Sequence, residues 1–172
     1  LAASCYPALW GKDGAGPSNL DAWIYYHAVA QWHAGGSLYD WYANPAQHLW
    51  PFTYTPLAAW VIAPLTWMSY QSATVLLIVA TPLCAAVTAY ATLRRLGARV
   101  RTAHNLAPWL ALIGVVALEP FPKTMEYAQV NAILMALVAV DLLLVPERSR
   151  WRGVLSGMAA AIKLTPAVAI LV

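Results

Sequence analysis

Charged side chains are scarce in this chain: Asp, Glu, Lys and Arg make up 10% of its 172 residues, whereas 61% are hydrophobic. A soluble core of this size would not use so many apolar residues, so the composition excludes an ordinary soluble domain. The net charge of +3 is too small to indicate nucleic-acid binding. Cysteine is also rare, and Cys5 in a polar stretch and Cys84 in an apolar one predict no disulfide framework.

Several stretches without charge are long enough to cross a membrane. Residues 72–93 carry no charged side chain, and about 20 residues of helix span a bilayer core of roughly 30 Å. Three further candidates are 102–118, 127–145 and 153–172. The sequence therefore predicts an all-α fold, a polytopic bundle of transmembrane helices. The chain begins without an initiator methionine and stops inside an apolar run, so we expect a fragment truncated at both ends.

Positive charge is concentrated in two short loops. Seven of the ten Lys and Arg residues are Arg94, Arg95, Arg99, Arg101, Arg148, Arg150 and Arg152. The positive-inside rule places both loops in the cytoplasm, which makes the turn over 119–127 an outer one. With 72–93 as the first crossing, the region 1–70 becomes an extracytoplasmic loop.

The apolar segment 51–70 is short and interrupted by proline. Pro56 and Pro64 bound its apolar part, and Trp60 and Trp67 are residues typical of membrane interfaces. We therefore expect a juxtamembrane helix over about 55–68 on the outer face, and not a further crossing.

Asp21 stands at the head of a helix-length run rich in Trp, Tyr and His, expected over about 19–34 and ended by Gly35-Gly36. One interpretation is structural: Ser18 and Asp21 have the spacing of a capping box, and an aromatic stripe on one helix face can anchor it at the interface. The other is chemical, because aromatic rings stack on sugars and a carboxylate can accept a proton from an attacking hydroxyl. The residues alone leave both open.

Four segments, taken in order, resemble glycosyltransferase family 87, whose members are GT-C-type membrane enzymes of actinobacteria. They are LDAWIYYHAVAQWHAGGSLYD (20–40), PFTYTPLAAWVIAPL (51–65), LEPFPKTMEYAQVNAILMAL (118–137) and GVLSGMAAAIKLTPAV (153–168). Two positions depart from the family pattern: Thr55 replaces the first of the two closing prolines of PFTYPP, and Ala128 replaces the glycine of GQVN. Both departures leave the polar residues in place.

The resemblance implies a GT-C bundle that transfers a sugar, most often mannose, from a polyprenyl-phosphate donor to a hydroxyl of a glycolipid or lipoglycan at the outer membrane face. It implies that Asp21 is the general base. Substrate-binding residues are then expected among the polar side chains of the matching segments: His27, Tyr54, Glu119, Lys123, Gln129, Asn131 and Lys163. For Glu126 an ordinary solvated loop position is the better interpretation.

Lys163 has an unusual position, because it follows Arg152 by about 16 Å of helix and so falls near the bilayer midplane. A charge at that depth costs at least about 2.5–3.5 kcal/mol and is functional or paired by default. It can contact the donor phosphate, or pair with an acid elsewhere in the protein. Asp141 is a poor partner because it falls nearer the cytoplasmic side.

The chain has no DxD pair, and its histidines (27, 33, 48 and 104) show no ligand-like clustering, so we expect neither a metal nor a cofactor. The expected partners are the sugar donor, the acceptor and the lipid bilayer, with no nucleic acid. Two alternatives are an arabinofuranose transferase and a transporter or flippase, which would also explain an intramembrane lysine and proline-interrupted helices. A purely structural membrane subunit would give no reason for Asp21 and Lys163 together.

Overall fold

The computed structural model describes residues 19–170, with side chains described for 19–167. Expectations that concern Ser18 and Cys5 lie outside these residues. The described part is mostly helical and contains one short antiparallel hairpin. Its elements are α2 (Leu20–His33), β1 (Tyr42–Asn44), β2 (Leu49–Pro51), α3 (Pro56–Ile62), the 3₁₀ helix η1 (Ala63–Trp67), α4 (Tyr70–Arg95), α5 (Val100–Ala117), α6 (Pro120–Glu126), α7 (Asn131–Leu144), α8 (Val154–Ile162) and the 3₁₀ helix η2 (Thr165–Ile170).

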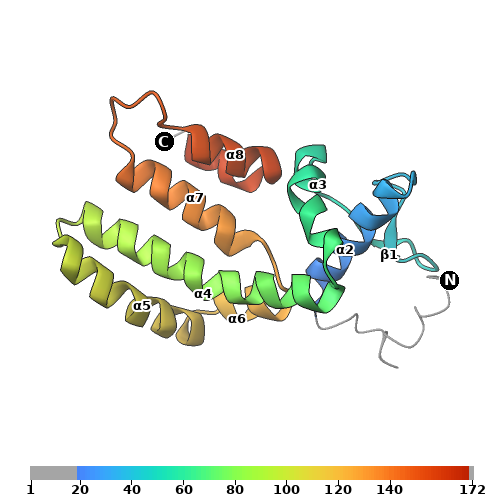
Figure 1. Cartoon of the computed structure of the whole chain (residues 1–172), viewed down its shortest axis with the longest axis horizontal. Coiled ribbons are helices and arrows are strands. Elements are labelled where there is room, and N and C mark those ends of the chain that lie inside the picture. The colour runs from blue at the N-terminus through green and yellow to red at the C-terminus, as the bar shows by residue number, and fades with distance from the viewer. Residues whose placement is uncertain (1–18, 171–172) are drawn as a thin grey trace.

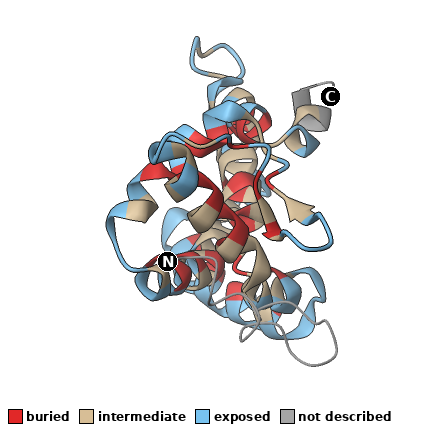
Figure 2. Ribbon diagram, turned by 90° about the vertical axis from the view of Figure 1, so that its right-hand side faces the viewer, coloured by how far each residue is buried: buried red, intermediate tan, exposed pale blue. Residues whose placement is uncertain are grey.

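Four helices lie side by side in the order α5, α4, α7, α8, and α2, α3 and the hairpin pack at one end of this row (Figure 1). The buried residues follow the middle of the molecule, where these helices meet (Figure 2). Small side chains make close packing possible there: Ala28 of α2 and Ala58 and Ala59 of α3 are fully buried. The core of this end is completed by the large buried rings of Tyr25 and Phe52.

Helix α4 is long and apolar enough to cross a membrane. It starts at Ser69, whose hydroxyl accepts a hydrogen bond from the Ser72 N–H at 3.2 Å, an N-cap that satisfies an otherwise unpaired donor. Helices α5 and α6 pass the same test only as a pair, bent by 79°. Apolar side chains on α4 and α5, such as Leu83 and Trp109, are exposed by 62% and 66%, as a lipid-facing surface requires.

Two of the four expected spans are shorter than the sequence analysis placed them. In the region 127–145 the helix begins only at Asn131, after a turn in which Ala128 adopts φ +49°. In 153–172 helix α8 stops at Ile162, and Lys163 is extended (φ −144°, ψ 130°). In a continuous α-helix, Pro166 would lack the N–H that bonds to the Ile162 carbonyl, and its ring would clash with that carbonyl. This helps to explain why α8 ends at Ile162 and a 3₁₀ helix follows.

The two arginine-rich loops lie together at the end of the row opposite α2 and the hairpin (Figure 1). An exposed ion pair joins them, with Arg95 Nη2 3.6 Å from Glu147 Oε1. At the same end, the fully buried Asp141 of α7 accepts hydrogen bonds from the backbone N–H groups of Gly153 (2.9 Å) and Ser156 (2.8 Å) at the start of α8. Asp141 thus pairs with a helix start and not with Lys163.

Candidate active site

Asp21 is placed by the way α2 begins. The helix follows Asn19, whose side chain makes no capping hydrogen bond. The N–H of Ala22, one of the first-turn donors that lack a partner within a helix, donates to the carbonyl of Tyr127 at 3.2 Å. This contact docks the start of α2 on the turn between α6 and α7. Within the described residues, the Asp21 carboxylate accepts a hydrogen bond at Oδ2 from Gln129 Nε2.

The turn before α7 aims Gln129 at Asp21. Ala128 is fully buried and takes a left-handed φ of +49°, a conformation that favours glycine. The N–H of Gln129 then bonds back to the Thr124 carbonyl at 2.9 Å, which closes the end of α6. The glycine of the family pattern at position 128 therefore has a physical reason, and this chain makes the same turn with alanine.

A continuous chain of hydrogen bonds runs from Asp21 to Lys163. Gln129 donates to Asp21, and Asn131 Nδ2 donates to Gln129 Oε1 at 2.5 Å. Lys163 Nζ donates to Asn131 Oδ1 at 3.0 Å and to the Tyr54 hydroxyl at 3.3 Å. The network brings together residues from α2, the loop before α3, the turn before α7 and the end of α8.

Tyr54 also contacts the ammonium group of Lys163 through its aromatic ring. Lys163 Nζ lies 5.1 Å from the centre of the Tyr54 ring, within the range of a cation–π contact. The Tyr54 hydroxyl is also 2.6 Å from the Tyr25 hydroxyl, and the two rings meet edge to face at 5.1 Å. Tyr25 is 1% exposed, so it is a rigid support for Tyr54.

An open pocket of about 500 Å³ contains both charges of this network. Its lining residues are Asp21, Thr53, Tyr54, Thr55, Gln129, Lys163, Leu164 and Thr165. A carboxylate that can accept a proton and an ammonium that can stabilise an anion therefore face one space. That combination suits the transfer of a group between a hydroxyl and an anionic leaving group.

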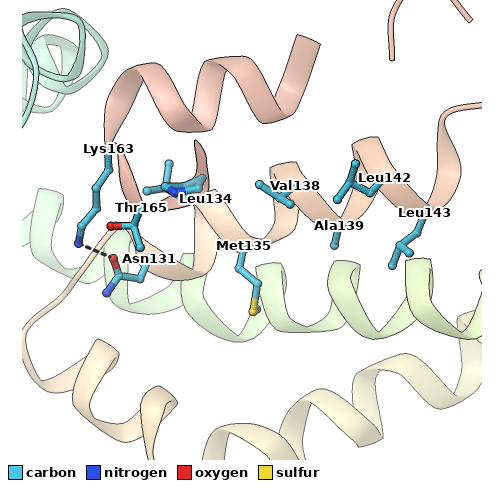
Figure 3. Close-up of a pocket in the computed structure, with 10 residues that line it drawn as sticks. Asn131, Leu134, Met135, Val138, Ala139, Leu142, Leu143, Lys163 and Thr165 are labelled. Atoms are coloured by element: carbon cyan, nitrogen blue, oxygen red, sulfur yellow. Dashed lines mark hydrogen bonds between the residues drawn. The ribbon is translucent and has the colours of Figure 1, made fainter. Parts of the chain in front are cut away.

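A second pocket, of about 690 Å³, continues from Lys163 as an apolar groove along α7. Figure 3 shows Lys163 bonded to Asn131 at one end, with the apolar side chains of α7 following one after another to Leu143. Lys163 and Thr165 line both pockets. A ligand with a charged head and a long apolar tail fits the two together.

Thr55 fastens the end of α8 that carries Lys163. Its hydroxyl accepts from the Ala58 N–H at 3.3 Å as the N-cap of α3. The same hydroxyl donates to the carbonyls of Ala161, and more weakly at 3.4 Å of Ile162, which lack helical partners at the end of α8. The departure from the family's proline therefore supplies a link that proline cannot make.

Burial changes the acid–base properties of Asp21. The half-buried site raises the pKa of its carboxyl above the ordinary value, while the Gln129 hydrogen bond and the Lys163 charge act in the opposite direction. Burial also raises the pKa of Tyr25 well above the usual value, so this hydroxyl stays protonated. Asp21 is thus a better proton acceptor than an exposed carboxylate, and it is held in its ionised form by two partners.

Three of the residues expected at the site lie elsewhere. His27 packs in an aromatic cluster on α4, 3.9 Å from the Trp23 ring centre and 5.7 Å from that of Tyr70. Burial lowers the pKa of His27 to about 4, so the ring is neutral at neutral pH. Glu119 and Lys123 are on the outer surface of α6, where Lys123 forms an exposed ion pair with Glu126 at 2.7 Å.

The predicted set of site residues does not include several that line or support this pocket, among them Tyr25, Thr53 and Thr165. Tyr25 follows Asp21 by one helical turn, so the 3.6-residue period places both on one face of α2, a signal that the aromatic crowding of this segment obscured. Thr53 lies in the loop before α3, and Thr165 is the first residue of the short 3₁₀ helix η2. Neither segment has a periodic pattern long enough to identify these residues. Within residues 19–170, no group of three or more His, Cys, Asp or Glu side chains could hold a metal ion.

Comparison with known proteins agrees with the resemblance. The chain is 35% identical, over 94% of its length, to a polyprenol-phosphate-mannose-dependent alpha-(1-2)-phosphatidylinositol mannoside mannosyltransferase of Mycolicibacterium smegmatis, and 34% identical over 94% to the protein of that name from Mycobacterium tuberculosis. A polyprenol-phosphate-mannose-dependent alpha-(1-2)-phosphatidylinositol pentamannoside mannosyltransferase of Mycobacterium tuberculosis is 32% identical over 89% of the chain. The chain covers 40%, 41% and 35% of these three relatives, respectively.

No solved structure matches the chain. The sequence profile of Glycosyltransferase family 87 matches residues 52–172, which include every site residue except Asp21 and Tyr25. Because that match covers more than half of the chain, the protein belongs to glycosyltransferase family 87.

Proposed function

We propose that the protein containing this chain transfers mannose from a polyprenyl-phosphate donor to a hydroxyl of a glycolipid of the phosphatidylinositol mannoside type. The carrying observation is that one pocket holds Asp21 and Lys163, and that an apolar groove starts at Lys163. The names of the relatives supply the sugar and the acceptor class. The reaction takes place at the extracytoplasmic face of a multi-pass membrane protein.

The donor lies with its phosphate at Lys163 and its isoprenoid tail in the groove along α7. Helix α7 has 14 residues, which gives a length of about 20 Å for the tail to follow. The lining is almost entirely apolar beyond Asn131 and Lys163. In this position the sugar extends from the phosphate into the smaller pocket, toward Asp21.

Asp21 accepts the proton of the acceptor hydroxyl as that oxygen forms a bond to the anomeric carbon of mannose. The bond between this carbon and the phosphate oxygen breaks, and polyprenyl phosphate leaves with its electron pair. Lys163 stabilises the negative charge that the phosphate gains. Aromatic rings beside the pocket, above all Tyr54, give the sugar an apolar face to lie against.

The positions of the charges support an outward-facing site. The arginine-rich loops lie at one end of the helix row and α2 at the other (Figure 1). If the arginines are cytoplasmic, as the positive-inside rule requires, the start of α2 with Asp21 is at the outer surface. The exposed rings of Trp60 and Trp67 on α3 and η1 suit a helix that lies at that interface.

The test is the Asp21→Asn variant, assayed in membranes with polyprenyl phosphate mannose as donor and a phosphatidylinositol mannoside as acceptor. Loss of a general base is expected to lower kcat by about 10²–10⁴-fold. The donor KM should change little, since the amide keeps the shape of the carboxylate. Asp40→Asn is the matched control, because Asp40 is exposed and outside the pocket. Wild-type kcat in Asp21→Asn would refute the role of this residue.

A further inference from the structure

The hydrogen bonds between Lys163 and Asp21 all run in one direction. Lys163 donates to Asn131, Asn131 donates to Gln129, and Gln129 donates to Asp21. Each amide uses its oxygen toward the cation and its nitrogen toward the anion. The two side chains therefore act as one polarised bridge between two opposite charges.

Opposite charges in one half-buried pocket attract each other strongly, and a direct ion pair would leave neither group free for a substrate. Resting on the proposed function, we propose that Gln129 and Asn131 are positioning residues that hold Asp21 and Lys163 apart, each charged and each with a side free for its substrate. Within residues 19–170, the Asp21 carboxylate accepts a hydrogen bond only at Oδ2, from Gln129, which leaves Oδ1 for the acceptor hydroxyl. Lys163 is steadied by Asn131 and Tyr54 and keeps its third proton for the phosphate.

Few of the described groups near Asp21 affect the ionisation of its carboxyl. Lys163 acts on it from the end of α8, and Tyr25 lies one turn further along α2 with its hydroxyl on Tyr54. Burial keeps the Tyr25 hydroxyl neutral at neutral pH. Among the described residues, Lys163 is therefore the cation that acts on Asp21, and Gln129 is its direct hydrogen-bond donor. Removing the Gln129 donor destabilises the ionised form and thereby raises the pKa of Asp21.

The test is the acidic limb of the pH profile of kcat/KM in three proteins: wild type, Gln129→Met and Gln129→Glu. Methionine removes the donor at similar size, and we expect the limb to move to higher pH by about one unit. Glutamate has almost the shape of glutamine but places a second carboxyl beside Asp21, so the limb should move further. Gln71→Met, at an exposed position in the first turn of α4, is the matched control and should leave the limb in place.

The other amide is tested by Asn131→Asp, which puts a carboxylate on Lys163 and should raise the donor KM about tenfold by competing with the phosphate. If the acidic limb stays in place in both Gln129 variants, the proposal is overturned, even when kcat, KM or protein abundance changes. A Gln129 that only contacts substrate, or only supports the fold, would alter those three quantities and leave the limb where it is. An unchanged donor KM in Asn131→Asp would overturn it as well. If Asp21→Asn is inactive while the limb is unmoved, the bridge fails but the proposed function stands; an active Asp21→Asn removes both.

Discussion

Thr55 is the residue whose single hydroxyl joins the start of α3 to the end of α8. Thr55→Val keeps the shape but removes the cap and leaves α8 carbonyls unpaired, so we expect the free energy of unfolding to fall by about 1–2 kcal/mol. Thr55→Ser keeps the hydroxyl and should therefore retain most of the wild-type free energy of unfolding. The measurement is denaturant unfolding of the purified protein in detergent.

Thr92→Val is the control for this change, because Thr92 is exposed and bonds only within its own helix, to the Thr88 carbonyl at 2.9 Å. It should alter stability by less than about 0.5 kcal/mol. Equal effects of the two valine variants would mean that the link between α3 and α8 contributes nothing.

At the scale of single residues, the sequence indicates which charged side chains are candidates for function better than it indicates which residues they contact. Lys163 stands out because a lysine deep in an apolar run is costly, and Asp21 because it is the acid of an aromatic segment. Nothing local reveals that Gln129 and Asn131 connect them across more than 100 residues. His27 was placed with the site on the resemblance alone, and the structure packs it against Trp23 and Tyr70.

Helices α7 and α8 are held together at both of their ends. Asp141 binds the start of α8, and Asn131 binds Lys163 just beyond its end. Asp141→Ala removes the acceptor of the buried Ser156 N–H and of the Gly153 N–H, and we expect a loss of about 2–4 kcal/mol in the free energy of unfolding.

Because α8 carries Lys163, the same variant should also raise the donor KM in the transfer assay. Glu147→Gln is the control, since its ion pair with Arg95 is exposed and worth less than about 1 kcal/mol. If Asp141→Ala lowers the free energy of unfolding no more than Glu147→Gln does, Asp141 does not hold α8 in place.

Among the elements, long apolar segments are the ones that composition predicts well. The charge-free run 72–93 lies within α4 (Tyr70–Arg95), and 102–118 lies close to α5 (Val100–Ala117). The hairpin of β1 and β2 was not expected, because strands of three residues are too short for an alternating pattern. The break at Lys163 was not expected either, because mean hydropathy does not register the local effect of Pro166 on the backbone.

For the whole molecule, the distribution of arginine is the basis of the orientation that we propose. Both arginine-rich loops lie at one end of the row, joined by the Arg95–Glu147 pair, and α2, which carries Asp21, lies at the other end (Figure 1). This separation cannot be read from any one segment, because it depends on how α4, α7 and α8 stack. The central claim is that this pocket receives the lipid-linked donor at the outer membrane surface.

The most direct measurement is thiol labelling of Thr53→Cys, a residue that is exposed and lines the pocket. Cys5 and Cys84 are first replaced by alanine, and Ser149→Cys in the second arginine-rich loop is the control. We expect an impermeant reagent to label position 53 in right-side-out vesicles and position 149 only in inverted ones. Polyprenyl phosphate mannose should slow labelling at 53 and leave 149 unchanged. Labelling of 53 only in inverted vesicles, or at a rate that the donor does not alter, would contradict the account.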